Sequence, residues 1–175
     1  MKLLMVTPYV PYPPSFGGSV RMYHLARELA RRNEVSVLTF VEDGGMGDPA
    51  GVEPFCREVI GIPRDVSRKR LRQLGSLCSR RSFQISFHHN ARMQAAIEEA
   101  AERLDIDAII VEFSQMTGFR FPAGIPVILD EHNVEYDLLA RMAEQGSPLR
   151  RIYNRREVRK FRAEELQAVR QAALT

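Results

Sequence analysis

Residues 2–40 read KLLMVTPYVPYPPSFGGSVRMYHLARELARRNEVSVLTF, and this stretch decides the fold class. The apolar run Lys2 to Val6 has the length of a strand, and the proline- and glycine-rich loop Pro8 to Gly18 follows it. From Met22 to Ala30 the apolar residues recur at the spacing that gathers side chains on one helical face. The run Glu34 to Phe40 is rich in β-branched and aromatic residues, which is typical of a second strand. A strand, a helix and a strand at this spacing predict a βαβ unit and therefore a parallel sheet.

The same alternation continues after a turn-rich stretch from Glu42 to Pro54. Further strands are expected at Arg57 to Ile62, Asp107 to Val111 and Pro126 to Leu129. Further helices are expected at Val66 to Ser79, Met93 to Leu104, Val134 to Glu144 and from Pro148 onward. The predicted fold class is α/β, a Rossmann-like open and mainly parallel sheet with helices on both faces, formed as a single domain by residues 1–175.

The last predicted helix has an apolar stripe made of Val158, Phe161, Leu166 and Val169. It ends at Thr175 without a capping glycine or a following strand, as if the chain had been cut. We therefore expect this chain to be part of a longer polypeptide.

The composition predicts a folded, water-soluble protein. The chain has 175 residues, of which 45% are hydrophobic and 27% charged, and this suits one well-buried domain. No apolar run approaches the roughly 20 residues needed to cross a bilayer, so a cytoplasmic location is expected. Cys56 and Cys78 have no metal-ligand spacing and are expected to be reduced and structural.

The net charge of +3 is too small for a dedicated nucleic-acid binder, so no nucleic-acid partner is expected. Of the 25 basic residues, seven lie in Arg64 to Arg81 and seven in Arg150 to Arg162, with only Asp65 and Glu157 opposing them. Such segments are most often solvated helix faces. The alternative is contact with anionic lipid or with a phosphorylated substrate, which would make the protein peripheral at the inner face of the membrane.

The paired glycines Gly17 and Gly18 precede the first predicted helix. Glycine lets a backbone approach an anion closely, and a helix N-terminus behind it favours phosphate. The pattern is neither Gly-x-Gly-x-x-Gly nor a P-loop, which disfavours an ordinary dinucleotide or nucleotide triphosphate site. The alternative is a plain turn with Ser19 as the helix cap.

A second polar group, Asp130-Glu131-His132-Asn133, follows the strand that ends at Leu129. Because parallel strands end at one edge of a sheet, this group and the Pro8 to Gly18 loop are expected to share that edge. Glu131 and Glu135 flank His132, where carboxylates would orient the imidazole ring. The alternatives are a histidine that caps the following helix and Asn133 as its N-cap.

Two segments resemble a known family, the retaining family-four glycosyltransferases of the GT-B fold. The first runs from Gly17-Gly18-Ser19-Val20-Arg21 through Tyr23-His24-Leu25-Ala26-Arg27-Glu28-Leu29 to Glu34-Val35-Ser36-Val37-Leu38-Thr39. The second, Asp130-Glu131-His132-Asn133-Val134-Glu135-Tyr136, is similar to the strand of that family that carries an active-site histidine. The resemblance covers the whole chain in order, and these two segments are its specific part.

The resemblance implies two Rossmann-like domains that face each other across a cleft, of which this chain is the N-terminal one. The C-terminal domain, which binds most of the nucleotide sugar and carries a motif of paired glutamates, has no counterpart in residues 1–175. The chain is therefore expected to be the acceptor-side lobe of an enzyme that transfers a sugar from a nucleotide sugar to a glycan, lipid or small-molecule acceptor. That role suits cell-envelope polysaccharide synthesis, and the lobe alone is expected to be inactive.

The resemblance also implies site residues. His132 would be catalytic, beside the transferred sugar. The donor diphosphate would lie near Phe16, Gly17, Gly18 and Ser19. The acceptor side would include Tyr9, Arg21, Glu112, Ser114, Glu131, Asn133 and Glu135. No metal and no cofactor are expected, because these enzymes usually stabilise the departing diphosphate with helix N-termini and basic side chains.

Two other functions stay open at this point. A parallel sheet alone would also suit a stand-alone nucleotide- or dinucleotide-binding domain. A non-catalytic adaptor that recruits partners through its basic surface is the second alternative.

Overall fold

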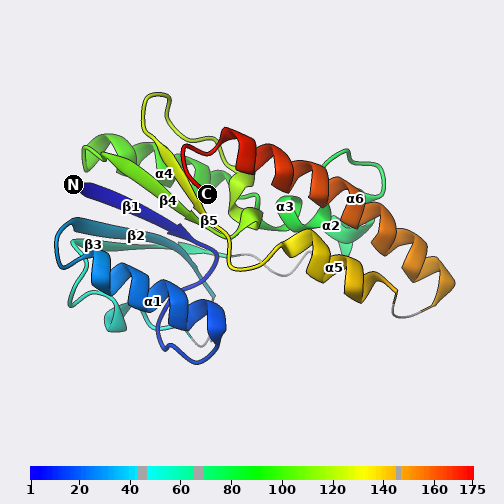
Figure 1. The fold of residues 1–175 in the computed structure, drawn as a ribbon, viewed down its shortest axis with the longest axis horizontal. Helices are drawn as coiled ribbons and strands as arrows, with labels where there is room; N and C mark the ends of the chain where they lie inside the picture. The colour runs from blue at the N-terminus through cyan, green and yellow to red at the C-terminus, as the bar shows by residue number, and fades with distance from the viewer. Residues whose placement is uncertain (43–46, 65–68, 145–146) are drawn as a thin grey trace.

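The computed structural model describes residues 1–42, 47–64, 69–144 and 147–175. Five parallel strands form one sheet in the order β3-β2-β1-β4-β5 (Figure 1). The strands are β1 (Lys2–Thr7), β2 (Glu34–Val41), β3 (Glu58–Pro63), β4 (Ala108–Glu112) and β5 (Val127–Asp130). The predicted α/β, Rossmann-like sheet is therefore confirmed.

Helices cover both faces of this sheet. Helix α1 (Gly17–Leu29) packs Met22 and Ala26 into the core cluster that holds Leu3 and Met5 of β1. The alternate residues of β1 point to the other face, because successive side chains of a strand point to opposite sides. There they join a second cluster with α4 (Ala91–Arg103) and the end of α6 (Pro148–Gln171).

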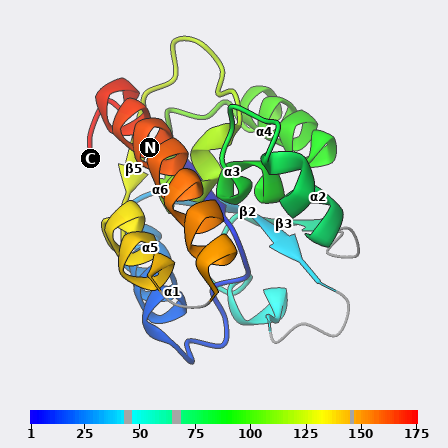
Figure 2. The same ribbon diagram turned by 90° about the vertical axis from the view of Figure 1, so that its right-hand side faces the viewer.

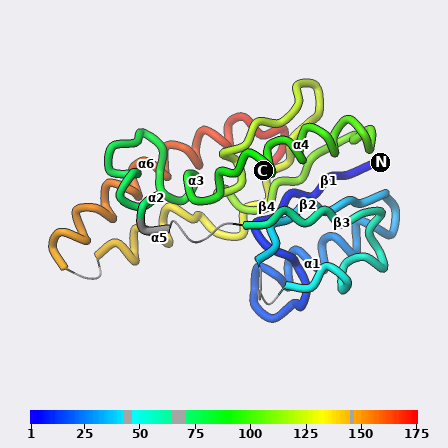
Figure 3. The backbone as a smooth tube through the Cα atoms, turned by 180° about the vertical axis from the view of Figure 1, so that it is seen from behind, coloured from blue at the N-terminus to red at the C-terminus, as the bar shows by residue number. Residues whose placement is uncertain are grey.

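The remaining helices gather beyond the carboxyl ends of the strands (Figures 1 and 2). These are α2 (Lys69–Ser76), α3 (Phe83–His88), α5 (Glu135–Ala143) and the first half of α6. Short 3-10 turns, η1 (Pro49–Gly51) and η2 (Ser114–Gly118), follow β2 and β4. The view from behind shows α2 and α3 beside α6 (Figure 3). None of the helices in the described part of the chain is both long and apolar enough to cross a bilayer.

Several predicted boundaries change. Gly17 and Gly18 open α1 and are not part of the loop. The N-cap is Phe16, while the Ser19 hydroxyl lies inside the helix and reaches back to accept hydrogen bonds from the backbone N–H groups of Ser15 and Phe16, both at 3.1 Å. Helix α3 is not predicted; Ser82 caps it. Residues 66–68 of the predicted basic helix and residues 43–46 of the predicted turn lie outside the described residues.

Helix α6 confirms only part of the predicted stripe, because Phe161 is buried and Val169 packs against the core cluster. Leu166 is 37% exposed, so its place in the stripe was wrong, while Phe161 is fully buried. The buried positions are Glu157, Phe161 and Glu165, at four-residue spacing. The chain beyond α6 also pairs with the sheet, because Leu129 N–H donates to the carbonyl of Leu174 over 2.9 Å.

The two cysteines form no disulfide. Cys56 is half-buried, and burial raises the pKa of its thiol to about 11. Cys78 is exposed, which corrects the expectation that it has a structural role.

Candidate functional site

The strand order reverses between the neighbouring strands β1 and β4. From β1 the chain proceeds to β2 and β3 on one side, and β4 and β5 lie on the other. Open parallel sheets bind ligands outside the carboxyl ends of the strands at such a point. The segments that follow β1, β4 and β5 meet here, and they carry most of the residues that the sequence analysis selected.

The centre of this site is a buried pair of His132 and Glu112. Glu112 is the last residue of β4 and is fully buried, and the His132 side chain is only 6% exposed. His132 Nε2 lies 2.7 Å from Glu112 Oε2. With Glu112 ionised, Nε2 donates the hydrogen bond and Nδ1 is left as the acceptor. Burial raises the pKa of Glu112, and the hydrogen bond from His132 opposes that rise.

Phe113 holds the imidazole ring on its other side. Its ring centroid lies 3.9 Å from that of His132, with an angle of 31° between the planes. The backbone of Phe113 has a φ of +69°, a value that bulky residues rarely adopt and that costs about 1–3 kcal/mol. Its N–H donates to the carbonyl of Asp130 over 3.0 Å. This strained residue therefore links β4 to the end of β5 and aims its ring at His132.

Gly18 brings the N-terminus of α1 against this group. A β-carbon at residue 18 would overlap the Tyr9 hydroxyl, lie 3.0 Å from Phe113 Cζ and lie 3.6 Å from His132 Nδ1. A β-carbon at Gly17 would meet nothing within 4 Å. Of the two glycines, only Gly18 is therefore at a position where the close approach of other side chains requires glycine. The structure brings the glycine pair and His132 together, in the first turn of a helix.

The N–H groups at the start of α1 are available to a ligand. Gly17 and Gly18 N–H have no acceptor among the described residues, as expected of the first turn of a helix. The helix adds a partial positive charge, and its first turn holds no acidic residue. The phenol of Tyr9 is half-buried beside Glu112, and burial raises its pKa well above the ordinary value. Tyr9 is therefore a neutral hydroxyl at this helix end.

Arg21 and Asp130 form a second connection between α1 and β5. Arg21 Nε lies 3.0 Å from Asp130 Oδ2, and its Nη2 contacts Oδ1. Asp130 Oδ2 also lies 3.9 Å from His132 Nε2. The predicted acceptor-side residue Arg21 is thus occupied by a bidentate ion pair with Asp130 in this structure.

Glu112, Asp130 and His132 also satisfy a loose criterion for a metal site. One ligand atom from each lies within 4.8 Å of the other two. However, the histidine and Glu112 are in direct hydrogen-bond contact, and Arg21 contacts both Asp130 oxygens. A cation here would have to break the His132–Glu112 hydrogen bond and displace Arg21 from Asp130. The arrangement therefore favours a hydrogen-bonded cluster over a metal site.

Glu165 is a site residue that the sequence analysis missed. It lies on α6 and is 2% exposed. Its Oε1 accepts hydrogen bonds from the Ser114 hydroxyl over 2.9 Å and from Glu135 N–H over 3.0 Å, and its Oε2 accepts one from Tyr136 N–H over 3.0 Å. Those N–H groups start α5, whose N-cap, Val134, offers no side-chain acceptor. Glu165 therefore caps α5 from another helix.

Because Glu165 is the cap, two of the predicted site residues have other contacts than expected. Asn133 is not the N-cap, and its amide contacts Glu135 Oε1 at 3.4 Å. Ser114 is buried and donates its hydroxyl hydrogen to Glu165. The segment 131–134, which carries His132, is thus followed directly by residues that are hydrogen-bonded to Glu165 of α6.

The remaining predicted carboxylates lie next to Glu165. Burial and the charges of Glu165 and Glu135 raise the pKa of Glu131 to about 7. Burial also raises the pKa of Glu135, whose Oε2 lies 3.3 Å from Gln115 Nε2. Glu131 and Glu135 therefore belong to a partly buried group of carboxylates around Glu165.

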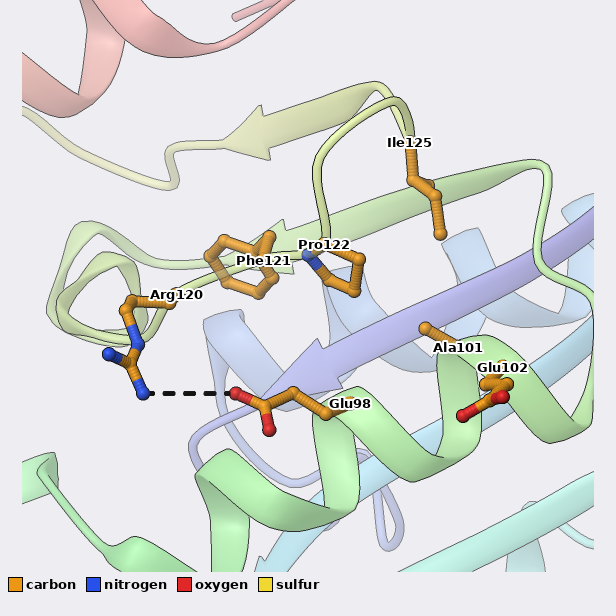
Figure 4. Close-up of a pocket in the computed structure, with 7 residues that line it drawn as sticks. All are labelled: Glu98, Ala101, Glu102, Arg120, Phe121, Pro122 and Ile125. Carbon is orange, nitrogen blue, oxygen red and sulfur yellow. Dashed lines mark ion pairs between the residues drawn. The ribbon is translucent and has the colours of Figure 1, made fainter.

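Among the cavities of the described part of the chain, two have a volume of about 410 Å³, and one of these two adjoins this site. That one is lined by the loop after β1, including Tyr9 and Phe16, by the end of β2 and by Arg64. The other lies between α4 and residues 120–125 (Figure 4), where Arg120 lies 4.0 Å from Glu98. None of the predicted site residues lines it.

Comparison with models of known protein families gives no match, and comparison with curated proteins gives none either. The functional assignment therefore depends on the residues and their geometry.

Proposed function

We propose that this chain is the acceptor-side lobe of a glycosyltransferase. In this proposal His132 lies beside the transferred sugar, and the start of α1 lies near the diphosphate of a nucleotide-sugar donor. One observation carries the proposal: the two segments resembling family-four glycosyltransferases meet at the reversal point of a parallel sheet, where a β-carbon at Gly18 would lie 3.6 Å from His132 Nδ1.

The chemistry of sugar transfer suits this arrangement. A departing diphosphate needs donors that are already in place, and the free N–H groups of Gly17 and Gly18 at a helix N-terminus are such donors. The positive charge that develops at the sugar needs a polar group of fixed orientation beside it. Glu112 and Phe113 hold the imidazole of His132 from two sides and supply that orientation. The residues that would contact the rest of the donor belong to a second lobe.

Binding of the diphosphate is testable on this chain alone. In an NMR titration with UDP, GDP or inorganic pyrophosphate, we expect the amide signals of Gly17, Gly18 and Ser19 to shift most. The isolated lobe is expected to bind weakly and to give no turnover. Tight binding of NAD would instead favour the stand-alone dinucleotide-binding domain, and the absence of any shift at α1 would contradict the proposed donor site.

The role of His132 is testable in a polypeptide that joins this chain to a donor-binding lobe. We expect His132→Ala to lower the turnover number by roughly 100-fold, the usual effect of losing one preorganised transition-state contact. The matched control is His24→Ala, because His24 is an exposed histidine of α1. Equal turnover numbers for the two variants would remove His132 from the mechanism.

We further propose an anionic membrane surface as a partner, because exposed apolar side chains accompany the basic segments. Leu71 and Leu74 of α2 are 67% and 63% exposed, and Leu149 and Ile152 of α6 are 80% and 66% exposed. Lysine and arginine near anionic lipid contribute about 1 kcal/mol each. We expect the protein to sediment with anionic vesicles. High salt and the double substitution Leu149→Ser/Ile152→Ser are each expected to reduce the amount that sediments. Equal sedimentation with neutral vesicles would contradict this proposal.

A further inference from the structure

The cavity beside the candidate site is lined by a buried arginine that has few oxygen partners among the described residues. Arg64 follows β3 directly, and its backbone N–H donates to the carbonyl of Val41 over 2.9 Å. Its side chain is only 11% exposed. The guanidinium carbon lies 5.3 Å from the ring centroid of Phe40 and 4.6 Å from that of Phe87. Aromatic rings therefore hold this cation at the cavity wall.

The polar contacts of Arg64 are weak for a buried charge. Its Nη1 lies 3.4 Å from both the Pro8 carbonyl oxygen and Glu42 Oε1, at the outer limit of hydrogen bonding. Its Nε is buried and has no hydrogen-bond partner among the described residues. A guanidinium has five N–H donors and normally finds a carboxylate or phosphate in a bidentate arrangement when buried. Among the described residues, no carboxylate makes such a bidentate contact with Arg64.

The charged groups around Arg64 also favour binding of an anion. Burial and the positive charge of Arg72 both lower the pKa of Arg64, and only Glu42 opposes them. Glu42 is 46% exposed, so water screens much of its charge. His88 adds no charge of either sign, because burial and Arg64 lower its pKa to about 4 and leave it neutral at pH 7. Among the described groups around Arg64, the two cations Arg64 and Arg72 outnumber the one carboxylate, Glu42.

We propose that this cavity binds the acceptor substrate, and that Arg64 recognises an anionic group on it, a phosphate or a carboxylate. This inference rests on the proposed function, since it names the acceptor of that reaction. Tyr9 and Phe16 connect the two places. Both line the cavity, and Tyr9 also lies against Gly18 and 5.9 Å from the ring centroid of Phe113. The cavity volume of about 410 Å³ suits a molecule of the size of a sugar phosphate.

Direct binding tests the inference without any turnover. Four probes are titrated into the chain by calorimetry or NMR: glucose 6-phosphate, glucuronate, neutral glucose and inorganic phosphate. We expect the two anionic sugars to bind and glucose to bind at least about tenfold more weakly, because it lacks the charge-assisted hydrogen bonds. Inorganic phosphate is expected to bind more weakly than glucose 6-phosphate, because it leaves the aromatic wall uncovered.

Three variants make the test specific. Arg64→Gln is expected to lower the affinity for glucose 6-phosphate about tenfold or more, and the exposed Arg80→Gln, the matched control, is expected to leave it unchanged. Glu42→Gln is expected to raise that affinity, because it removes the carboxylate that competes for Arg64. This variant keeps the test valid if Arg64→Gln does not fold.

Glucose that binds as tightly as the anionic sugars, phosphate that binds as tightly as glucose 6-phosphate, or a Glu42→Gln variant that binds more weakly would each overturn the inference. Failure of the proposed function would appear in a different experiment, in which the His132→Ala enzyme keeps an undiminished turnover number. The two failures are therefore distinguishable.

Discussion

The backbone of Gly18 lies directly against the hydroxyl group of Tyr9, so that a β-carbon at residue 18 would overlap it. Tyr9 cannot move away freely, because its ring centroid lies 5.2 Å from that of Phe16 and 5.9 Å from that of Phe113. The start of α1, the aromatic group and His132 are thus packed as one unit. Gly17, the preceding residue, has open space at the same position.

The two glycines are therefore expected to respond in opposite ways to alanine. Gly18→Ala forces the aromatic group to shift, and overpacking of this kind costs about 1–3 kcal/mol of unfolding free energy. Gly17→Ala is expected to add about 0.4–1 kcal/mol, because it restricts the unfolded chain at no steric cost. Urea unfolding followed by circular dichroism measures both. Equal effects of the two substitutions would show that the close approach at Gly18 is not tight.

Removal of the Glu165 carboxylate is expected to destabilise the protein strongly. Glu165→Ala leaves the buried N–H groups at the start of α5 and the Ser114 hydroxyl without their acceptor, and each unsatisfied buried group costs about 1–3 kcal/mol. Gln167→Ala, an exposed position on the same helix, is the control. Thermal unfolding should separate the two variants, and faster amide exchange of Glu135 and Tyr136 should accompany the loss. A Glu165→Ala protein as stable as the control would argue against the cap.

Glu131 is expected to make the stability depend on pH. Its pKa is about 7 in the folded protein, against an ordinary value of 4.5, so the folded state keeps a proton that the unfolded state loses. The unfolding free energy therefore falls as the pH rises from about 4.5 to about 7, and the contribution is constant above that range. Glu131→Gln is expected to reduce the difference between the melting temperatures at pH 5 and pH 8, while the exposed Glu102→Gln is not. An unchanged difference in Glu131→Gln would contradict the raised pKa.

The sheet was predictable because its signals are local. The apolar run at Lys2 and the helical period from Met22 each depend on neighbouring residues, and both elements occur, although α1 begins earlier than predicted, at Gly17. The shared edge of parallel strands was enough to expect His132 near the glycine pair. Helix α3 has only six residues, too few to show a helical period, and it was missed.

Contacts between distant segments account for what the sequence analysis missed at the site. Glu165 caps a helix that begins 30 residues earlier, and a glutamate in a helical stripe usually indicates a solvated face. Leu166 fits the apolar period, but in α6 it is exposed and the neighbouring Glu165 is buried instead. In the sequence Arg64 is one residue of a basic segment, and its contacts with the rings of Phe40 and Phe87 arise only in the folded chain.

The positive φ at Phe113 sets the needs of stability and of the site against each other. Glycine would adopt this backbone without strain, so a sequence selected only for thermal stability would favour glycine at residue 113. That replacement would remove the ring that lies on His132. Variants selected only for stability are therefore expected to acquire glycine at residue 113, and such variants would lose the ring that orients His132.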